Sequence, residues 1–160
     1  IVDDVKSGGT ESLIAQALRL GDIKSENDPL LIDREAMKAV FDNLPEEDKQ
    51  VLQRTKDRVE IFAKAQRAAL TDTSITIPGG YAGHTVSPMS VAGCYAPGGR
   101  YPLPSSVIMT AVTARVAGVG KIVVASPRPA LATVAAAHVS GADVLLCVGG
   151  AQAVAAMAFG

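Results

Sequence analysis

The sequence has few aromatic residues, and its charges nearly cancel. Phe, Tyr and Trp together make up 4% of the 160 residues, and tryptophan is absent. Ala, Val and Gly supply most of the apolar surface instead, which favours a closely packed helix–sheet core over an aromatic-rich sandwich. The formal net charge is −1, so the chain lacks the basic surface that nucleic acid or an anionic membrane attracts. We therefore expect neither as a partner.

Cysteine is also scarce, with only Cys94 and Cys147, both inside apolar runs. We interpret them as buried small residues in a reducing compartment, the cytoplasm or an organelle such as a plastid. Two cysteines are too few for a metal site. No signal peptide is apparent, and the apolar stretch 144–159 is too short and too interrupted to span a bilayer. The chain starts without Met and stops inside an Ala-rich run, so we expect it to continue beyond residue 160.

Composition changes near residue 75. Charged residues are frequent before that point and rare after it. We expect a helical N-terminal region over residues 1–75 and the first part of an NAD-binding α/β domain over residues 76–160. In the first region, apolar spacing predicts a helix over 1–21 interrupted at 7–10, a second helix from the capping residue Asp33 to about Asn43, and a third from 45 to 70.

The second region begins with a loop or short strands, in which Ile75 to Ile77 alternate and are expected to pair. Strands and helices then alternate with short Gly or Pro punctuation. Strands are predicted at 91–96, 121–125 and 143–148, and helices at 104–118, 129–140 and from 150 onward. Such alternation implies right-handed crossovers. The predicted fold class is α/β: a helical N-terminal arm followed by an incomplete Rossmann-like, doubly wound parallel sheet.

Ligands of such sheets bind beyond the carboxyl ends of the strands, where three loops fall here. These loops are residues 96–100, 126–129 and 148–152. The first and third pair glycines with a helix start, an arrangement that suits a phosphate. Neither is a G-x-G-x-x-G or P-loop motif. On local chemistry alone, Gly149-Gly150 is as much a close-packing feature as a phosphate contact.

Side chains in these loops are candidates for ligand contacts. Tyr95 is suited either to stack on or hydrogen-bond to a nucleotide, or to pack in the core. Gln152 places an amide in the first turn of an apolar helix, where it needs partners and favours a ligand-facing role. Arg100 is suited to pair with a substrate anion or cofactor phosphate, the alternative being an ordinary surface arginine.

These residues carry a resemblance to a known family. Residues 93–109, GCYAPGGRYPLPSSVIM, resemble the Y-x-P-G-G … L-P-S-[ST]-V-x-M segment of histidinol dehydrogenases. Residues 114–119, Ser126-Pro127 and residues 148–160, VGGAQAVAAMAFG, match further family motifs in the same order and spacing. The strong resemblance covers about residues 78–160.

The resemblance implies a zinc-dependent enzyme that uses NAD twice to oxidise an alcohol, through an aldehyde, to a carboxylate. It also implies a homodimer and a non-standard Rossmann-like fold. The family's NAD-contacting Tyr and Gln fall on Tyr95 and Gln152, and Pro97 is the next expected cofactor contact. The family's zinc ligands and acid/base residues lie further along the chain, so no catalytic or metal-binding residue is assigned, and we expect this segment alone to be inactive.

Two departures from the family pattern place the substrate in question. Arg100-Tyr101 replaces small residues, and Thr113 stands where the family usually has Pro. Arg-Tyr-Pro-Leu resembles a side branch that oxidises other small alcohols, including sulfonated diols such as sulfopropanediol. The expected activity is thus oxidation of L-histidinol to L-histidine, in histidine biosynthesis, or of a sulfonated diol. A truncated, non-catalytic nucleotide-binding or structural subunit is the remaining alternative.

Overall fold

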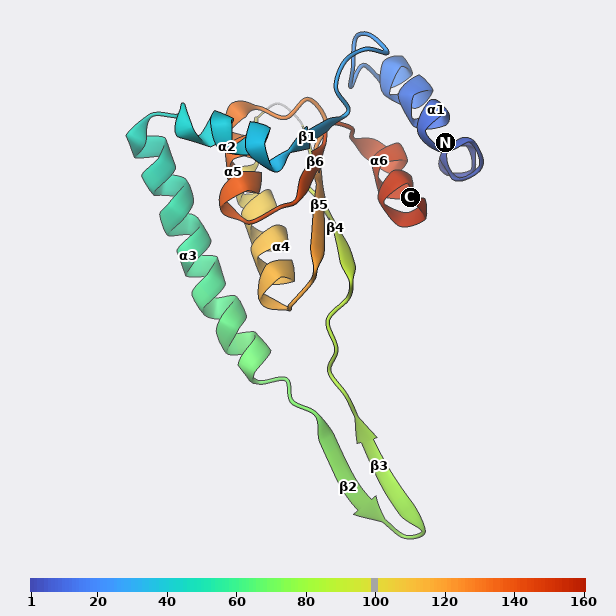
Figure 1. Ribbon diagram of the computed structural model, residues 1–160, viewed down its shortest axis with the longest axis vertical. Coiled ribbons are helices and arrows are strands. Elements are labelled where there is room, and N and C mark those ends of the chain that lie inside the picture. Colours follow the sequence, from blue (N-terminus) through green and yellow to red (C-terminus); the bar gives the residue numbers. More distant parts are fainter. Residues whose placement is uncertain (99–100) are drawn as a thin grey trace.

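The computed structural model describes residues 1–98 and 101–160 and centres on a four-stranded sheet (Figure 1). Its strand order is β1-β6-β5-β4. The strands are β1 (Leu31–Asp33), β4 (Val91–Tyr95), β5 (Lys121–Ala125) and β6 (Val144–Leu146). β4, β5 and β6 are parallel, with Tyr95 opposite Ala125 and Ala125 opposite Leu146. The predicted parallel α/β sheet is confirmed.

Strand β1 was not predicted. It joins the sheet antiparallel to β6, with Leu31 opposite Leu146 and Asp33 opposite Val144. A three-residue strand is too short to show the alternation by which a strand is recognised in a sequence. Part of the expected helical region therefore contributes an edge to the sheet. The division of the chain into domains at residue 75 stays a prediction.

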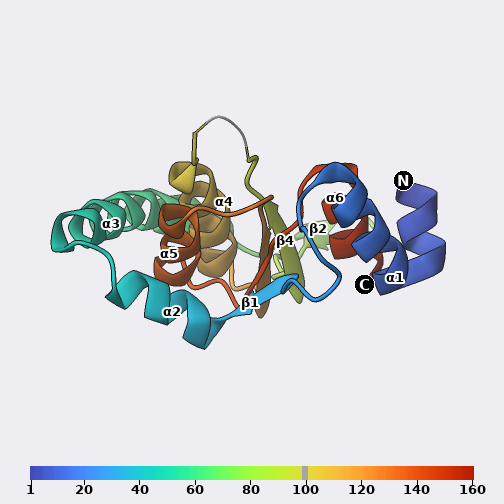
Figure 2. The same ribbon diagram turned by 90° about the horizontal axis from the view of Figure 1, so that it is seen from above.

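Helices cover both faces of the sheet, as a doubly wound fold requires (Figure 2). On one face lie α4 (Pro104–Val116) and α5 (Leu131–Val139), and on the other α1 (Val2–Leu20) and α6 (Gly150–Phe159). Two further helices, α2 (Arg34–Asp42) and α3 (Glu46–Ala68), pack outside α5 and α4. Asp33 caps α2 as predicted, with its carboxylate accepting from the Ala36 N–H at 2.8 Å.

Small residues let the inner helices lie close to the sheet. Ala111 of α4 and Ala135 and Ala136 of α5 are fully buried against Ile122 and Val124 of β5. Burying a side chain such as Ile122 contributes about 1.5–3 kcal/mol. A second cluster, which includes Leu13, Ala17, Leu146, Val148 and Ala153, joins α1 and α6 to the other face. Because small residues bring the helices close to the sheet, the core between them needs few bulky aromatic side chains.

Helix α1 bends and ends at glycines. Gly9 has φ 55° and ψ −136°, a conformation outside the helical region, which confirms the predicted interruption. Gly21 has φ 74° and ends the helix in the left-handed conformation, with its N–H directed at the carbonyls of Ala17 and Leu18. Glycine is favoured there because a side chain is strained at positive φ. This ending directs the chain, and the next residue Asp22, toward the sheet edge.

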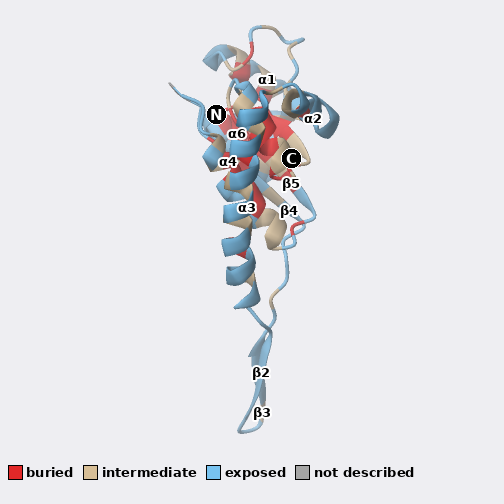
Figure 3. Ribbon diagram, turned by 90° about the vertical axis from the view of Figure 1, so that its left-hand side faces the viewer, coloured by how far each residue is buried: buried red, intermediate tan, exposed pale blue. Residues whose placement is uncertain are grey.

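A hairpin projects from the body between α3 and β4. It comprises β2 (Thr73–Ile77) and β3 (Gly80–His84), with Ile75 opposite Ala82, so the expected pairing of this segment is confirmed. Buried residues gather in the sheet and its covering helices, whereas the hairpin is exposed along its length (Figure 3). Within the described part of the chain, no helix has both the length and the apolar character needed to cross a membrane.

Candidate functional site

The three loops at the carboxyl ends of the strands meet around Pro127. A Cβ atom placed on Gly149 would lie 2.7 Å from the Cβ and Cγ atoms of Pro127. One placed on Gly98 would lie 2.3 Å from the same Cγ atom. Both glycines therefore let the backbone approach the proline ring, which a side chain would block. For Gly149, the close-packing interpretation left open by the sequence has direct structural support.

Asp22 connects the end of α1 to the start of α6. Its Oδ2 atom accepts a hydrogen bond from the Gly149 N–H at 3.0 Å and another from Gln152 Nε2 at 3.2 Å. Gln152 is only 2% exposed, so its amide needs such a partner. A carboxylate at a helix start is also stabilised by the helix dipole. Asp22 was missed by the sequence analysis, because only its place directly after a helix-ending glycine marks it.

Tyr95 reaches the same helix start from the end of β4. Its hydroxyl oxygen accepts the Gly150 N–H at 3.1 Å, and its ring packs, half-buried, on the cluster around Val148. The structure therefore brings Tyr95 and Gln152 together at the first turn of α6. Two N–H groups of this turn, those of Gly149 and Gly150, already have acceptors in the protein.

A cavity of about 360 Å³, which Pro127 also lines, lies between the loops after β4 and β5 and the start of α5. Pro97, the third predicted cofactor contact, lines this cavity and not the α6 turn. Its polar lining includes Ser126, Arg128 and Thr133. The Arg100 hypothesis falls outside the described residues. The remaining members of the lining are Gly98, Tyr101, Pro102, Pro127, Pro129 and Ala130.

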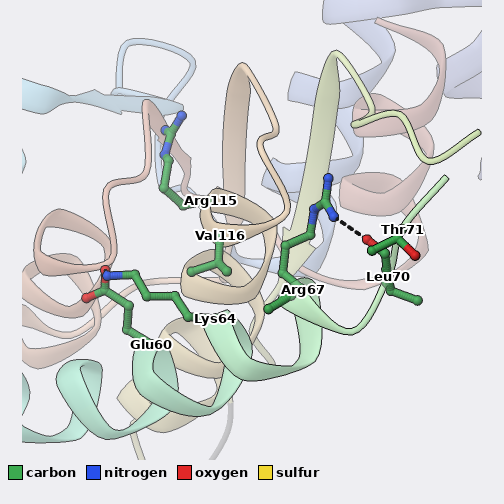
Figure 4. A pocket seen from close by; sticks show the side chains of 8 residues that line it. Glu60, Lys64, Arg67, Leu70, Thr71, Arg115 and Val116 are labelled. Atoms are coloured by element: carbon green, nitrogen blue, oxygen red, sulfur yellow. Dashed lines mark hydrogen bonds and ion pairs between the residues drawn. The ribbon is translucent and has the colours of Figure 1, made fainter.

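A larger cavity, of about 560 Å³, lies between the C-terminal parts of α3 and α4, away from the three loops (Figure 4). Its basic side chains already have partners. Lys64 Nζ lies 2.7 Å from the Glu60 carboxylate, and Arg67 donates to the Leu70 carbonyl at 2.9 Å. Hydrogen bonds from Lys56 and Lys64 lower the pKa of Glu60 to about 2, so this carboxylate stays ionised. Arg115 pairs with Asp143 at 2.9 Å. We therefore do not take this cavity as the functional site.

The cysteines offer no reactive thiolate. Cys94 and Cys147 are both free and buried, as predicted. Burial raises the pKa of the Cys147 thiol to about 11 and also raises that of Cys94. In the described residues, no three His, Cys, Asp or Glu side chains lie together as a metal ion would require. These residues do not fit a zinc site.

The site is thus the carboxyl edge of a doubly wound sheet, formed by loops with close backbone approach. The sequence matches the histidinol dehydrogenase family over residues 1–160, so the chain belongs to that family. It is 38% identical over 165 residues to histidinol dehydrogenase homolog 1 of Mesorhizobium japonicum, covering 100% of this chain and 33% of that protein. It is also 38% identical over 166 residues to sulfopropanediol 3-dehydrogenase of Ruegeria pomeroyi, covering 100% of this chain and 38% of that protein.

The fold has a counterpart among solved structures. The crystal structure of histidinol dehydrogenase from Elizabethkingia anophelis superposes with a TM-score of 0.83 at 24% sequence identity. The match covers 99% of this chain and 37% of that one. The chain therefore spans about a third of the length of the relatives it matches.

Proposed function

We propose that this chain is the cofactor-binding part of an NAD-dependent dehydrogenase that oxidises a small alcohol. The observation that carries the proposal is the convergence of three loops on Pro127, with Tyr95 and Gln152 at the start of α6 and Pro97 in the cavity that Pro127 also lines. Doubly wound sheets bind dinucleotides at this edge. The names of the family and of its relatives support a dehydrogenase acting on a CH–OH group.

The residues of the site suit the parts of a dinucleotide. Pro97 offers an apolar surface beside a polar cavity large enough for part of a nucleotide. Tyr95 presents a ring and a hydroxyl at the start of α6, and Gln152 supplies an amide one turn further on. When bound, NAD supplies hydride acceptance, so the task of these residues is to bind and orient it. For NAD to contact Gln152 closely, the Gln152 amide must either turn away from Asp22 or keep its hydrogen bond to Asp22 while it also bonds NAD.

Two alcohols are candidate substrates. The family name favours L-histidinol, oxidised through the aldehyde to L-histidine in histidine biosynthesis. A sulfonated diol is the second candidate, and the observation that favours it is the 38% identity to a sulfopropanediol 3-dehydrogenase. An arginine at position 100 would pair with the sulfonate.

The proposal also includes a zinc ion and a second subunit, both of which would involve residues outside the described part of the chain. No described cluster fits zinc, so its ligands must come from elsewhere, and we assign these residues no step that involves the metal.

The outer face of α6 exposes Val154 and Phe159, and α1 exposes Leu20. Apolar groups on one side of a molecule are often interface residues. A homodimer partner or further chain of the same protein would cover them.

The test is an assay of NAD reduction by the full-length protein that contains this sequence. Histidinol, sulfopropanediol and a simple diol are compared, with and without a metal chelator. Tyr95→Phe removes the hydroxyl that, while it accepts the Gly150 N–H, is placed to donate to the dinucleotide, and we expect the KM for NAD to rise about 5-fold, the value of a hydrogen bond of about 1 kcal/mol. Tyr81→Phe, on the exposed hairpin, is the matched control.

A well-folded, metal-loaded protein that oxidises none of the three alcohols would overturn the dehydrogenase proposal. It would instead favour the non-catalytic alternative, a nucleotide-binding or structural subunit. Activity on the sulfonated diol alone would identify the side branch as the correct assignment. Equal KM values for Tyr95→Phe, Tyr81→Phe and the wild type would remove Tyr95 from the cofactor site.

A further inference from the structure

The start of α6 is a poor place for a phosphate in this structure. The Gly149 and Gly150 N–H groups donate to Asp22 and Tyr95, and the Asp22 carboxylate brings a negative charge to the same turn. A phosphate placed there would find both N–H donors already bonded to other acceptors. It would also be repelled by the Asp22 carboxylate at close range. The phosphoryl groups of a dinucleotide therefore need another set of donors at this edge of the sheet.

The start of α5 supplies such donors in the N–H groups of Leu131 and Ala132, whereas those of Thr133 and Val134 already donate to the Ala130 carbonyl. Its N-cap residue Ala130 has no side chain able to accept from the first turn, and no side-chain cap is formed. The helix runs for nine residues, Leu131–Val139, so its dipole is directed along the axis toward this end. Helix α5 begins at the wall of the 360 Å³ cavity, which Ala130 and Thr133 both line.

Two hydroxyl-bearing residues that are almost fully buried, Ser126 and Thr133, line the same cavity. Ser126 and Thr133 are each only 3% exposed. Neither side chain makes a hydrogen bond to any described residue. Among the described residues, Ser140 Oγ is the one fully buried side-chain polar atom without a partner, so the Ser126 and Thr133 oxygens are open to the cavity and free to bond water or a ligand there. A ligand with several acceptor oxygens fits both, since each hydroxyl can donate to it.

Arg128 adds a positive charge at the cavity and a strained backbone. Its φ of 44° makes it the one residue other than glycine with positive φ in the described part of the chain. Arginine gains nothing from this conformation, and strain of this kind is found at ligand sites, where it aims a side chain. Arg128 is exposed, is one of the residues that line the cavity, and makes no ion pair with a described residue.

We propose that this cavity binds a phosphoryl group of the dinucleotide, held by Arg128, the Ser126 and Thr133 hydroxyls and the first turn of α5. The inference rests on the proposed function and names the part of the cofactor that the cavity takes. Guanidinium, hydroxyl and helix-start N–H groups are the donors that phosphate binds best. The group is either the pyrophosphate of NAD or, in NADP, the 2′-phosphate of the adenosine ribose, which an arginine after the second strand accommodates in related folds.

The test uses Arg128→Asn and Arg128→Lys in the full-length protein. Asparagine tolerates positive φ, so the first variant removes the charge while keeping the backbone conformation. The second variant keeps the charge. Arg54→Gln, on the exposed face of α3, is the matched control for loss of one positive charge. Dissociation constants are measured by calorimetry for NAD, NADP and adenosine, and thermal melting checks that each variant is folded.

We expect Arg128→Asn to weaken dinucleotide binding about 10-fold or more, Arg128→Lys to restore much of it, and adenosine binding to stay unchanged, as loss of a charge-assisted contact predicts. An equal loss for NAD and NADP places the pyrophosphate in the cavity, whereas a loss for NADP alone places the 2′-phosphate there. Both results support the proposal.

The proposal is overturned if Arg128→Asn leaves both dinucleotides within about 2-fold of the wild type, a change of the size that surface charges alone produce. It is also overturned if adenosine binding falls as much as dinucleotide binding, because the loss would then not depend on phosphate. If the wild type turns over NAD and Arg128→Asn leaves dinucleotide binding unchanged, only this inference is removed. A wild type that neither binds nor uses either dinucleotide removes the proposed function as well.

Discussion

The Asp22 carboxylate accepts the Gly149 N–H at 3.0 Å, although 127 residues separate the two along the chain. Its second hydrogen bond, from Gln152 at 3.2 Å, holds the one buried amide of the α6 first turn. The N-terminal helix thereby takes part in positioning the candidate site, and its end at Gly21 sets where Asp22 lies. Asp22 acts through Gly149 and Gln152, so we regard it as a positioning residue.

Replacing Asp22 should loosen this connection. We expect Asp22→Ala to reduce the free energy of unfolding by about 2 kcal/mol, because it leaves a buried amide and an N–H without their acceptor. Asp22→Asn keeps one acceptor oxygen and should lose less. Urea unfolding measures both, with Glu11→Ala, an exposed acid on α1, as the control. If Asp22→Ala is as stable as the control, the link between α1 and α6 has no energetic role.

The same variant separates structure from cofactor binding. If Asp22 positions Gln152 for NAD, Asp22→Ala should raise the KM for NAD more than it lowers kcat, and Asp22→Asn should partly restore it. A purely structural role predicts that both variants keep a normal KM in whatever fraction remains folded. The measurement is steady-state kinetics of the full-length protein at a temperature well below the melting point of each variant.

Gly149 offers a direct test of close packing at Pro127. Alanine there would place its Cβ atom 2.7 Å from two atoms of the proline ring, a contact that forces the loop or α6 to move. We expect a loss of about 1–3 kcal/mol in unfolding free energy, the usual cost of overpacking. Gly80→Ala, whose Cβ would meet no atom within 4 Å, is the control. A Gly149→Ala variant as stable as this control would show that the loop accommodates a side chain freely.

The elements from residue 91 onward were predictable because each carries its own local signal. Lys121–Ala125 is a β-branched run bounded by glycine and proline, and the strand has those bounds. Asp33 was identified as a cap because capping depends on the next three residues. Strand β1 carried no such signal, since Leu31–Asp33 becomes a strand only by pairing with β6, more than 100 residues later.

The candidate site was predictable only in part, for the same reason. Tyr95 and Gln152 could be proposed from motifs, yet their meeting at one helix start depends on the order of strands in the sheet. Asp22 has no motif of its own, and the positive φ of Arg128 cannot be read from its neighbours. Long-range pairing and backbone conformation are properties of the folded chain, which residue type alone does not reveal.

The buried thiols should react slowly in the folded protein. Burial raises the pKa of Cys147 to about 11 and also raises the pKa of Cys94, so at pH 8 nearly all of both thiols are protonated. The thiolate is the reactive form, and access is restricted as well. We expect reaction with a disulfide reagent to be about 100-fold slower in the native protein than in urea. Rapid native labelling of either cysteine would contradict the burial of these strands.

The ion pair at the opposite edge of the sheet makes stability depend on pH. Asp143 accepts hydrogen bonds from the Ile122 N–H at 2.7 Å and from Arg115 at 2.9 Å, and it pairs with Arg34. Burial alone raises the pKa of Asp143, but the hydrogen bonds from Ile122 and Arg115 and the nearby charges outweigh it and lower the pKa below its usual 3.8. The folded protein therefore stabilises the ionised form.

Because the folded pKa is lowered, the contribution of Asp143 is fully present above pH 3.8 and is lost as the pH falls through the folded value. We expect Asp143→Asn to cost about 2 kcal/mol at neutral pH, since it leaves two arginines beside a neutral amide. Urea unfolding of variant and wild type at several pH values should show this gap constant above about pH 5 and shrinking below the usual Asp pKa. Glu26→Gln, at an exposed position in the loop between α1 and β1, should show no such gap at any pH. A gap of equal size at pH 3 and pH 7 would mean that Asp143 stabilises the fold through packing and not through its charge.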